Sequence, residues 1–237
     1  MKKLITILVL CLAFAVQAQT QNVDGQPQKQ EPQTPQQALI EHFLKKYTLA
    51  NRWNDQVTAK DALYDLIAES GSDSLTYNLA VYYYENQQYA SSVLISKDLL
   101  ERAPKNVNLL QIAATCYESL GLKDKALVHY ESLYLLTNNT GILYKMAMLQ
   151  YEIKRYPEAK INVDILLTKP DLDKLKVSVN NAENKGKEYP LKVSVLNMKG
   201  LLAAQTGDKI LAKKCFEDAL AIAPDFPSAK DNLSKLK

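Results

Sequence analysis

Apolar and small side chains recur at helical spacing in the stretch Leu196–Pro224, and the rest of the chain is organised around this pattern. Gly207 and Asp208 interrupt it and predict a turn between two short helices, and Pro224 ends the second helix. The small residues, which let two helices approach closely, are Gly200, Ala203, Ala212 and Ala219. The larger apolar residues between them are Leu196, Phe216 and Leu220. Two helices this short cannot bury their own apolar faces, so the pattern predicts neighbouring copies.

Upstream segments repeat this order of small, aromatic and apolar positions. The small residue of the second helix recurs in steps of 33, 34 and 33 residues, from Ala59 through Ser92 and Ala126 to Ala159. The next step, from Ala159 to Ala212, is 53 residues, which corresponds to one repeat plus an insertion the size of a hairpin. The four upstream segments, of which the first is the faintest, are Phe43–Gly71, Thr76–Pro104, Leu110–Asn138 and Leu143–Asp171.

The period and the residue types together resemble the tetratricopeptide repeat, most closely in Leu196–Pro224 and Leu110–Asn138. The family's tryptophan near the start of the first helix is missing, and leucine or threonine stands there. The resemblance implies an all-α, right-handed α-solenoid of about five helix pairs with a C-terminal capping helix. It places the repeats at about 40–71, 73–106, 107–139, 140–171 and 193–226, an insertion at 172–190 and the capping helix at 227–237.

The start of the chain has the pattern of a secretory signal peptide over residues 1–18. A short basic segment precedes an apolar run over 4–16, and small residues come next where a signal peptidase would cut, before Gln19. A membrane anchor is the alternative, but spanning a bilayer takes roughly 20 apolar residues. A lipoprotein signal at Cys11 is disfavoured, because Leu10 stands where a small residue is needed.

Residues 19–37 are rich in glutamine and proline and contain almost no large apolar side chains, which predicts a flexible linker. Such a linker either holds the repeats away from a surface or is a spacer with no further role. Together with the signal peptide, it predicts an exported protein, periplasmic or associated with the outer envelope. After cleavage of the signal, we do not expect an integral membrane protein.

The insertion at 172–190 is the least repeat-like part of the chain. Residues 174–179 alternate polar and apolar side chains, and Lys192–Val195 shows the same alternation beyond a run of turn-forming asparagines. We expect a small β-hairpin that projects between the fourth and fifth helix pairs, with a long solvated loop as the alternative. Loops above about 12–15 residues are often functional or disordered, so the insertion is a candidate for covering or extending a binding face.

Composition and motifs favour no enzymatic, cofactor or metal site. The net charge is +3 and no basic stripe carries interleaved aromatics, so nucleic acid is not an expected partner. No glycine-rich phosphate loop, Ser–His–Asp set or metal-ligand spacing is present, and His42 and His129 stand alone. Cys116 and Cys215 lie two repeats apart. Each helix layer adds roughly 8–10 Å, which exceeds the span of a disulfide, so we expect two buried, unpaired thiols.

In tetratricopeptide-repeat proteins the first helices of successive repeats line a concave groove that takes extended or helical peptides. The two-carboxylate clamp of chaperone-binding relatives needs Lys, Asn and Arg along these helices. Only Lys145 and Asn78 match, so a C-terminal carboxylate is not the expected ligand. Carried over by position, the residues that would line the groove here are Tyr77, Val81, Tyr84, Gln111, Thr115, Glu118, Tyr144, Met148, Tyr151 and Asn197.

This residue set is aromatic and polar, and tyrosines at helical spacing also serve ordinary packing between repeats. Three functions therefore stay open. The first is a non-enzymatic scaffold of the cell envelope that binds a protein or peptide partner in the groove. The second is a glycan or small-molecule binder that stacks tyrosines on sugar rings. The third is an inert accessory subunit of an envelope enzyme complex. Oligomeric state and the identity of the partner are not predicted.

Overall fold

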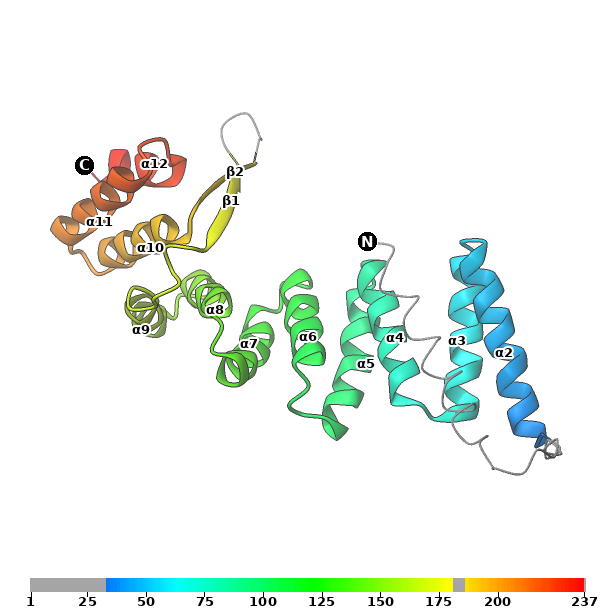
Figure 1. Ribbon diagram of the computed structural model, residues 1–237. Helices are drawn as coiled ribbons and strands as arrows, with labels where there is room; N and C mark the ends of the chain where they lie inside the picture. Colours follow the sequence, from blue (N-terminus) through cyan, green and yellow to red (C-terminus); the bar gives the residue numbers. More distant parts are fainter. Residues whose placement is uncertain (1–32, 181–185, 237) are drawn as a thin grey trace, which may run out of the picture. The chain divides into compact units, whose positions relative to one another are not determined.

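The computed structural model describes residues 33–180 and 186–236 of the 237-residue chain (Figure 1). By its contacts the chain divides into two units, Met1–Leu39 and Ile40–Lys237, and the repeats lie in the second. The expected signal peptide, and the expected linker up to residue 32, fall outside the described residues. The helices are α2 (Pro35–Arg52), α3 (Gln56–Ser70), α4 (Asp73–Glu85), α5 (Tyr89–Arg102), α6 (Val107–Ser119), α7 (Lys123–Thr137), α8 (Thr140–Glu152), α9 (Tyr156–Leu166), α10 (Leu191–Gln205), α11 (Lys209–Ile222) and α12 (Pro227–Lys235).

The predicted all-α solenoid of helix pairs is confirmed, and the pairs share one turn geometry. Within each described pair, three residues join the two helices, and the middle residue has a positive φ. Its φ lies between 58° and 81°, the left-handed region that closes a tight turn. In chain order these middle residues are Asn54, Gln87, Gly121, Lys154 and Gly207. Glycine fills two of the five positions, so the repeat's fold imposes the geometry even where the residue type does not favour it.

The small residues predicted to lie at helix crossings are buried in the structure. Ala80, Ala114 and Ala147 on the first helices have no exposed surface. At the equivalent position on α10, Gly200 faces the ring of Phe216 on α11 so closely that no Cβ would fit. Ser92 takes the small position on α5, and its hydroxyl donates a hydrogen bond of 2.8 Å to the carbonyl of Ala80 on α4. Small side chains therefore set how closely the two helices of a pair approach.

The insertion contains the predicted β-hairpin, with strands β1 (Lys176–Asn180) and β2 (Gly186–Pro190) paired antiparallel. The position of the second strand differs from the prediction. Lys192–Val195, which alternates like a strand, forms the first turn of α10, and β2 lies in a segment whose first residues resembled a turn. Val193 and Val195 are fully buried, so packing against the neighbouring helices overrides their intrinsic preference for a strand.

The hairpin packs against the C-terminal end of the solenoid. The buried ring of Tyr189 on β2 meets Phe226 edge-to-face, with ring centroids 5.0 Å apart. The Tyr189 hydroxyl donates to the carboxylate of Asp225 at 3.2 Å, and Lys187 forms an ion pair with the same carboxylate. Phe226 also lies directly before the predicted capping helix, α12, whose Ala229 is fully buried. Strand, cap and last helix pair thus form one packed end.

The first helix begins earlier than the composition indicated. α2 starts at Pro35, inside the stretch 19–37 that we expected to be linker. Proline is favourable in the first helical turn, where its missing donor costs little. The Thr34 hydroxyl accepts from the Gln37 N–H at 3.2 Å, and the Gln37 side chain accepts from the Thr34 N–H at 2.9 Å. This reciprocal cap explains how a glutamine- and proline-rich segment starts a helix.

Candidate functional site

The ten predicted groove residues lie on four first helices, α4, α6, α8 and α10. Gln111 is exposed, Asn197 is buried, and the other eight are partly buried. Equivalent positions alternate in character along the repeats: Tyr84 on α4 corresponds to Glu118 on α6 and to Tyr151 on α8. The groove is therefore aromatic at the second and fourth helix pairs and charged between them.

The aromatic positions on α4 serve packing. Tyr77, Val81 and Tyr84 all pack against a core cluster whose buried residues come from α5, α6, α7 and α8. The ring of Tyr84 lies edge-on to Tyr89 of α5, with centroids 6.2 Å apart. Burial raises the pKa of Tyr77, as expected for a phenol that has lost part of its hydration. These three residues are consistent with the packing alternative left open by the sequence.

The charged part of the groove is a closed network. Glu118 accepts a hydrogen bond from the Tyr130 hydroxyl at 2.9 Å and pairs with the Lys145 ammonium at 2.7 Å. Burial, reinforced by this carboxylate, raises the pKa of Tyr130. Because both oxygens of Glu118 are engaged, it is poorly placed to act as a catalytic base. Lys145 is engaged by the same carboxylate.

The aromatic positions on α8 have a different environment. Tyr144, Met148 and Tyr151 line a cavity of about 460 Å³ bounded by α8, α10, β1 and the start of α12. We call it the α8–β1 cavity. Four of the ten predicted residues converge here, and none of the described lining residues comes from α4 or α6. The full lining is Tyr144, Met148, Tyr151, Glu152, Val177, Ser178, Val179, Asn180, Ser194, Asn197, Met198, Leu201, Phe226 and Ser228.

The lining mixes apolar and uncharged polar groups. Among the described residues that form it, Glu152 alone carries a formal charge, and its carboxylate pairs with Lys123 of α7 at 2.9 Å. The side-chain oxygen of Asn197, another lining residue, accepts a hydrogen bond from Asn232 of α12 at 2.9 Å. Burial raises the pKa of Tyr144, so its hydroxyl stays protonated at neutral pH. This is the chemistry of a recognition surface, with apolar area and a few polar groups that fix orientation.

The sequence made the insertion a candidate for extending a binding face but identified none of its lining residues. β1 supplies four consecutive lining residues, and α12 and the residue before it supply Ser228 and Phe226. The hairpin itself was predictable from its alternation, but the side on which it would lie was not. A tyrosine that packs against Tyr151 was also missed: the ring centroid of Tyr156 on α9 lies 5.5 Å from that of Tyr151. Its equivalence to Tyr89, five residues after Tyr84, is the signal that would have found it.

Comparison with known proteins gives the fold its name. Residues 193–226 match the tetratricopeptide repeat family model. No curated protein matches the sequence. Among solved structures, YrrB, described as a TPR protein with an unusual peptide-binding site, superposes with a TM-score of 0.60 at 14% identity, covering 84% of this chain and 97% of its own. A tetratricopeptide repeat protein from Parabacteroides merdae gives 0.58 at 18%, covering 84% and 72%. MamA gives 0.55 at 12%, covering 83% and 94%.

The chain has a tetratricopeptide-repeat fold. All three structures share less than a fifth of their residues with it, so the likeness concerns the fold alone. The matched segment 193–226 is α10 and α11 together with the turn after them, the pair from which the sequence pattern was first recognised.

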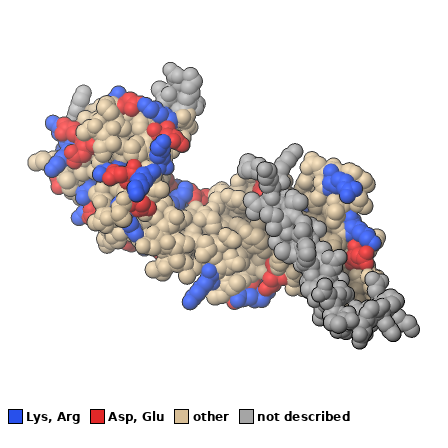
Figure 2. Space-filling view, viewed as in Figure 1, with Lys and Arg blue, Asp and Glu red and all other residues tan. Residues whose placement is uncertain are grey.

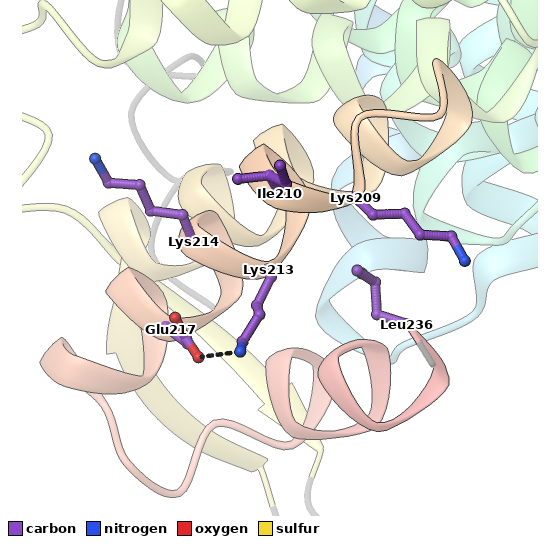
Figure 3. A pocket seen from close by; sticks show the side chains of 6 residues that line it. All are labelled: Lys209, Ile210, Lys213, Lys214, Glu217 and Leu236. Carbon is purple, nitrogen blue, oxygen red and sulfur yellow. Dashed lines mark ion pairs between the residues drawn. The ribbon is translucent and has the colours of Figure 1, made fainter.

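A second cavity, of about 430 Å³, lies on α11 of the tetratricopeptide-repeat solenoid (Figure 3). Three lysines line it, but Figure 3 shows the amino groups of Lys209 and Lys214 pointing in opposite directions. The third, Lys213, pairs with Glu217 at 3.7 Å. These side chains do not converge on a common point, so we assign no ligand to this surface.

Charge on the tetratricopeptide-repeat solenoid is mixed in sign. On the face shown in Figure 2, acidic and basic side chains alternate over α10–α12, and the surface over α6 and α7 is mostly uncharged. Within the described residues, no group of three or more His, Cys, Asp or Glu is placed to hold a metal ion. No helix in that part of the chain is long and apolar enough to span a bilayer.

The cysteine prediction is confirmed for the two thiols in the described repeats. Cys116 and Cys215 are both buried and unpaired. Burial raises the pKa of each thiol, which keeps both in the unreactive protonated form. They therefore pack as small apolar residues.

Proposed function

We propose that this protein is a non-enzymatic scaffold of the cell envelope that binds a segment of a partner protein in the α8–β1 cavity. The proposal rests on one observation: Tyr144, Met148 and Tyr151 of α8 converge on a cavity that α10 and the inserted hairpin also line. Such a concave site, apolar with a few polar groups, suits a peptide segment. The established part is coarser: the fold is one that generally mediates contacts between proteins.

Three further points support the proposal. The YrrB structure is described as having a peptide-binding site on a protein of similar fold. The charged groups predicted between the two aromatic parts of the groove, Glu118 and Lys145, form an ion pair with each other, so they do not form a competing catalytic centre. The apolar run over residues 4–16, with small residues after it, supports export into the envelope.

The test is capture of a partner by crosslinking in intact cells, with one variant inside the cavity and one outside it. Met148→Ala removes apolar surface from the cavity lining. Leu135→Ala removes a similar side chain from the second helix α7, where it is 84% exposed and away from the cavity. We expect wild type and Leu135→Ala to capture the same defined partner, and Met148→Ala to lose it. Circular dichroism establishes that both variants keep their helices.

Two results would replace the proposal. Equal capture by all three proteins would show that the cavity is not the binding site. Binding of cell-wall oligosaccharides in calorimetry, lost in Met148→Ala and with no protein captured, would favour the glycan binder. If the partner that copurifies is an enzyme, the protein is instead an accessory subunit of an enzyme complex.

A further inference from the structure

The two strands of the hairpin present different outer edges. The N–H of Leu191 donates to the carbonyl of Leu175 at 2.8 Å, so these two residues form a hydrogen-bonded pair just before the first register pair, Lys176–Pro190. Hydrogen-bonded and non-hydrogen-bonded pairs alternate along an antiparallel ladder. Val177 and Val179 therefore bond to β2. The backbone N–H and C=O groups that point away from β2 belong to Lys176, Ser178 and Asn180.

The outer edge of β2 lacks one backbone donor that the outer edge of β1 has. On β2 the outward-pointing positions are Gly186, Glu188 and Pro190, and proline has no N–H to donate. The outer edge of β1 contains no proline. Within residues 33–180 and 186–236, no backbone group bonds to the outward N–H or C=O of its three residues. An unpaired strand edge is a template for another strand, and folded proteins usually block it.

The outer edge of β1 borders the α8–β1 cavity. Successive side chains of a strand point to opposite faces, so a cavity beside one face would be lined by every second residue. Here Val177, Ser178, Val179 and Asn180 all line it, and no described residue of β2 does. The strand therefore meets the cavity along its edge. Tyr144, Met148 and Tyr151 of α8 provide other parts of the lining. An extended chain lying in the cavity can pair with β1 and contact these side chains.

The charge of the cavity lining indicates which charged side chains a bound peptide would have. Glu152 is the single formal charge among the described lining residues, its side chain is 41% exposed, and Lys123 bonds one of its two oxygens. The faces of Tyr144 and Tyr151 also attract cations. A lysine or arginine side chain of the peptide can bond the Glu152 oxygen that Lys123 does not bond.

We infer that the partner segment is an extended, cationic peptide that adds to β1 as a third antiparallel or parallel strand, with one lysine or arginine reaching Glu152. This inference rests on the proposed function and names the partner of the same cavity. Backbone pairing supplies register, and the alternate side chains of the peptide face α8 and α10. The insertion thereby gives the solenoid a strand-pairing site in addition to its helical groove.

Matched proline variants separate the two edges. Ser178 and Glu188 lie directly opposite each other in the register, and both point their N–H groups outward. Ser178→Pro and Glu188→Pro each remove one outward donor and leave the bonds between β1 and β2 in place. Ser178→Ala removes the hydroxyl and keeps the donor. Thermal unfolding of the full-length chain establishes that all three variants fold as wild type does.

The probe is a displayed library of random decapeptides, selected on the full-length wild-type chain, from which an enriched peptide is synthesised. We expect Ser178→Pro to bind it at least three- to tenfold more weakly, the effect of roughly one hydrogen bond. Glu188→Pro should bind it as wild type does, and Ser178→Ala, which keeps the outward donor, should bind it more tightly than Ser178→Pro. The bound peptide should slow hydrogen exchange at the amides of Lys176, Ser178 and Asn180, with no change at Val177. Enriched sequences should contain lysine or arginine, and Glu152→Gln should weaken binding.

The outcomes distinguish this inference from the proposal on which it rests. If Tyr151→Ala weakens binding but Ser178→Pro does not, a peptide binds in the cavity without pairing to β1, and strand addition is overturned while the proposed function stands. If no enriched peptide depends on Tyr151, the proposed function and strand addition fail together. Enriched peptides that lack a cation, or that bind Glu152→Gln unchanged, overturn the assigned charge.

Discussion

The second and fourth helix pairs have the same groove tyrosines and different surroundings. Tyr77 and Tyr84 on α4 correspond to Tyr144 and Tyr151 on α8, and each pair has a supporting tyrosine at the start of its second helix. On α4 these residues pack against the core between repeats. On α8 they line the α8–β1 cavity as well as packing. The same residue pattern thus has two structural outcomes in one chain.

The difference arises from the segment that comes after each pair along the chain. After α5 the next pair begins at Val107, one regular period on, and α6 packs against both α4 and α5. After α9 the chain inserts the hairpin before α10. β1 then lies where the groove is otherwise bounded by helices alone. A tyrosine stripe is therefore not sufficient for a site, and the added wall is the feature that turns packing residues into lining residues.

The largest predicted effect comes from displacing α10, one of the helices that line the α8–β1 cavity. Gly200 on α10 faces Phe216, and an added Cβ would lie 2.9 Å from Cζ and closer still to Cδ1 and Cε1 of that ring. We expect Gly200→Ala to lower the free energy of unfolding by about 3 kcal/mol, since overpacking of this kind cannot relax without moving α10. Chemical denaturation of the purified variant measures it.

Gly207→Ala is the matched control. Gly207 has a φ of 81°, and nothing lies within 4 Å of its added Cβ, so the substitution causes backbone strain without a clash. We expect a loss of about 1 kcal/mol. If the two variants are equally stable, the close approach of α10 and α11 does not hold the last pair in place.

A second prediction compares the equivalent tyrosines directly. Tyr151→Ala should weaken binding of a captured partner segment by about 2 kcal/mol, the scale of a buried aromatic anchor. Tyr84→Ala removes the same side chain at the equivalent position, outside the described lining of the cavity. We expect it to lower stability but to change the dissociation constant by less than a factor of about three. Calorimetric titration of both variants decides between them. Equal losses would show that the site extends along α4, α6 and α8 without need of the hairpin.

The repeats were predictable because each has a local signal and a periodic one. The small residues at Ala80, Ala114 and Ala147 recur at a fixed step, and packing of paired helices allows little else at these crossings. Turn positions such as Gln87 and Lys154 gave no signal of their own. They have positive φ because the helices on either side fix the path of the chain. Periodicity therefore located the pairs more reliably than turn chemistry would have.

The site was only partly predictable. Position within the repeat identified Tyr144, Met148 and Tyr151, but the same rule also named Tyr77, which packs against the core. The position of β1 distinguishes them, because β1 contacts α10 and lines one cavity together with α8. No local pattern encodes that placement. The second strand was misplaced for a related reason, since buried packing drew Val193 and Val195 into α10.

The smallest predicted effect is a pH dependence that belongs to the third helix pair and leaves the cavity unchanged. The His129 ring stacks on Tyr117, with centroids 5.4 Å apart, and burial, with a contribution from Lys97, lowers the pKa of His129. The folded state therefore disfavours the charged imidazole more than the unfolded state does. The contribution of neutral His129 to the free energy of unfolding is fully present above the unfolded-state pKa of about 6.5. It is lost as the pH falls below that value toward the lowered folded-state pKa.

Denaturation of wild type and His129→Gln at a series of pH values between 5 and 8 measures this effect. The wild-type stability should decline on the acid side, and the variant, which lacks the titrating ring, should decline less. Peptide affinity at the α8–β1 cavity should not track the same curve, because His129 is not among the residues that line the cavity. A parallel change in affinity and stability would mean that the third pair and the cavity are coupled, and the contrast between packing tyrosines and lining tyrosines would then no longer be a local one.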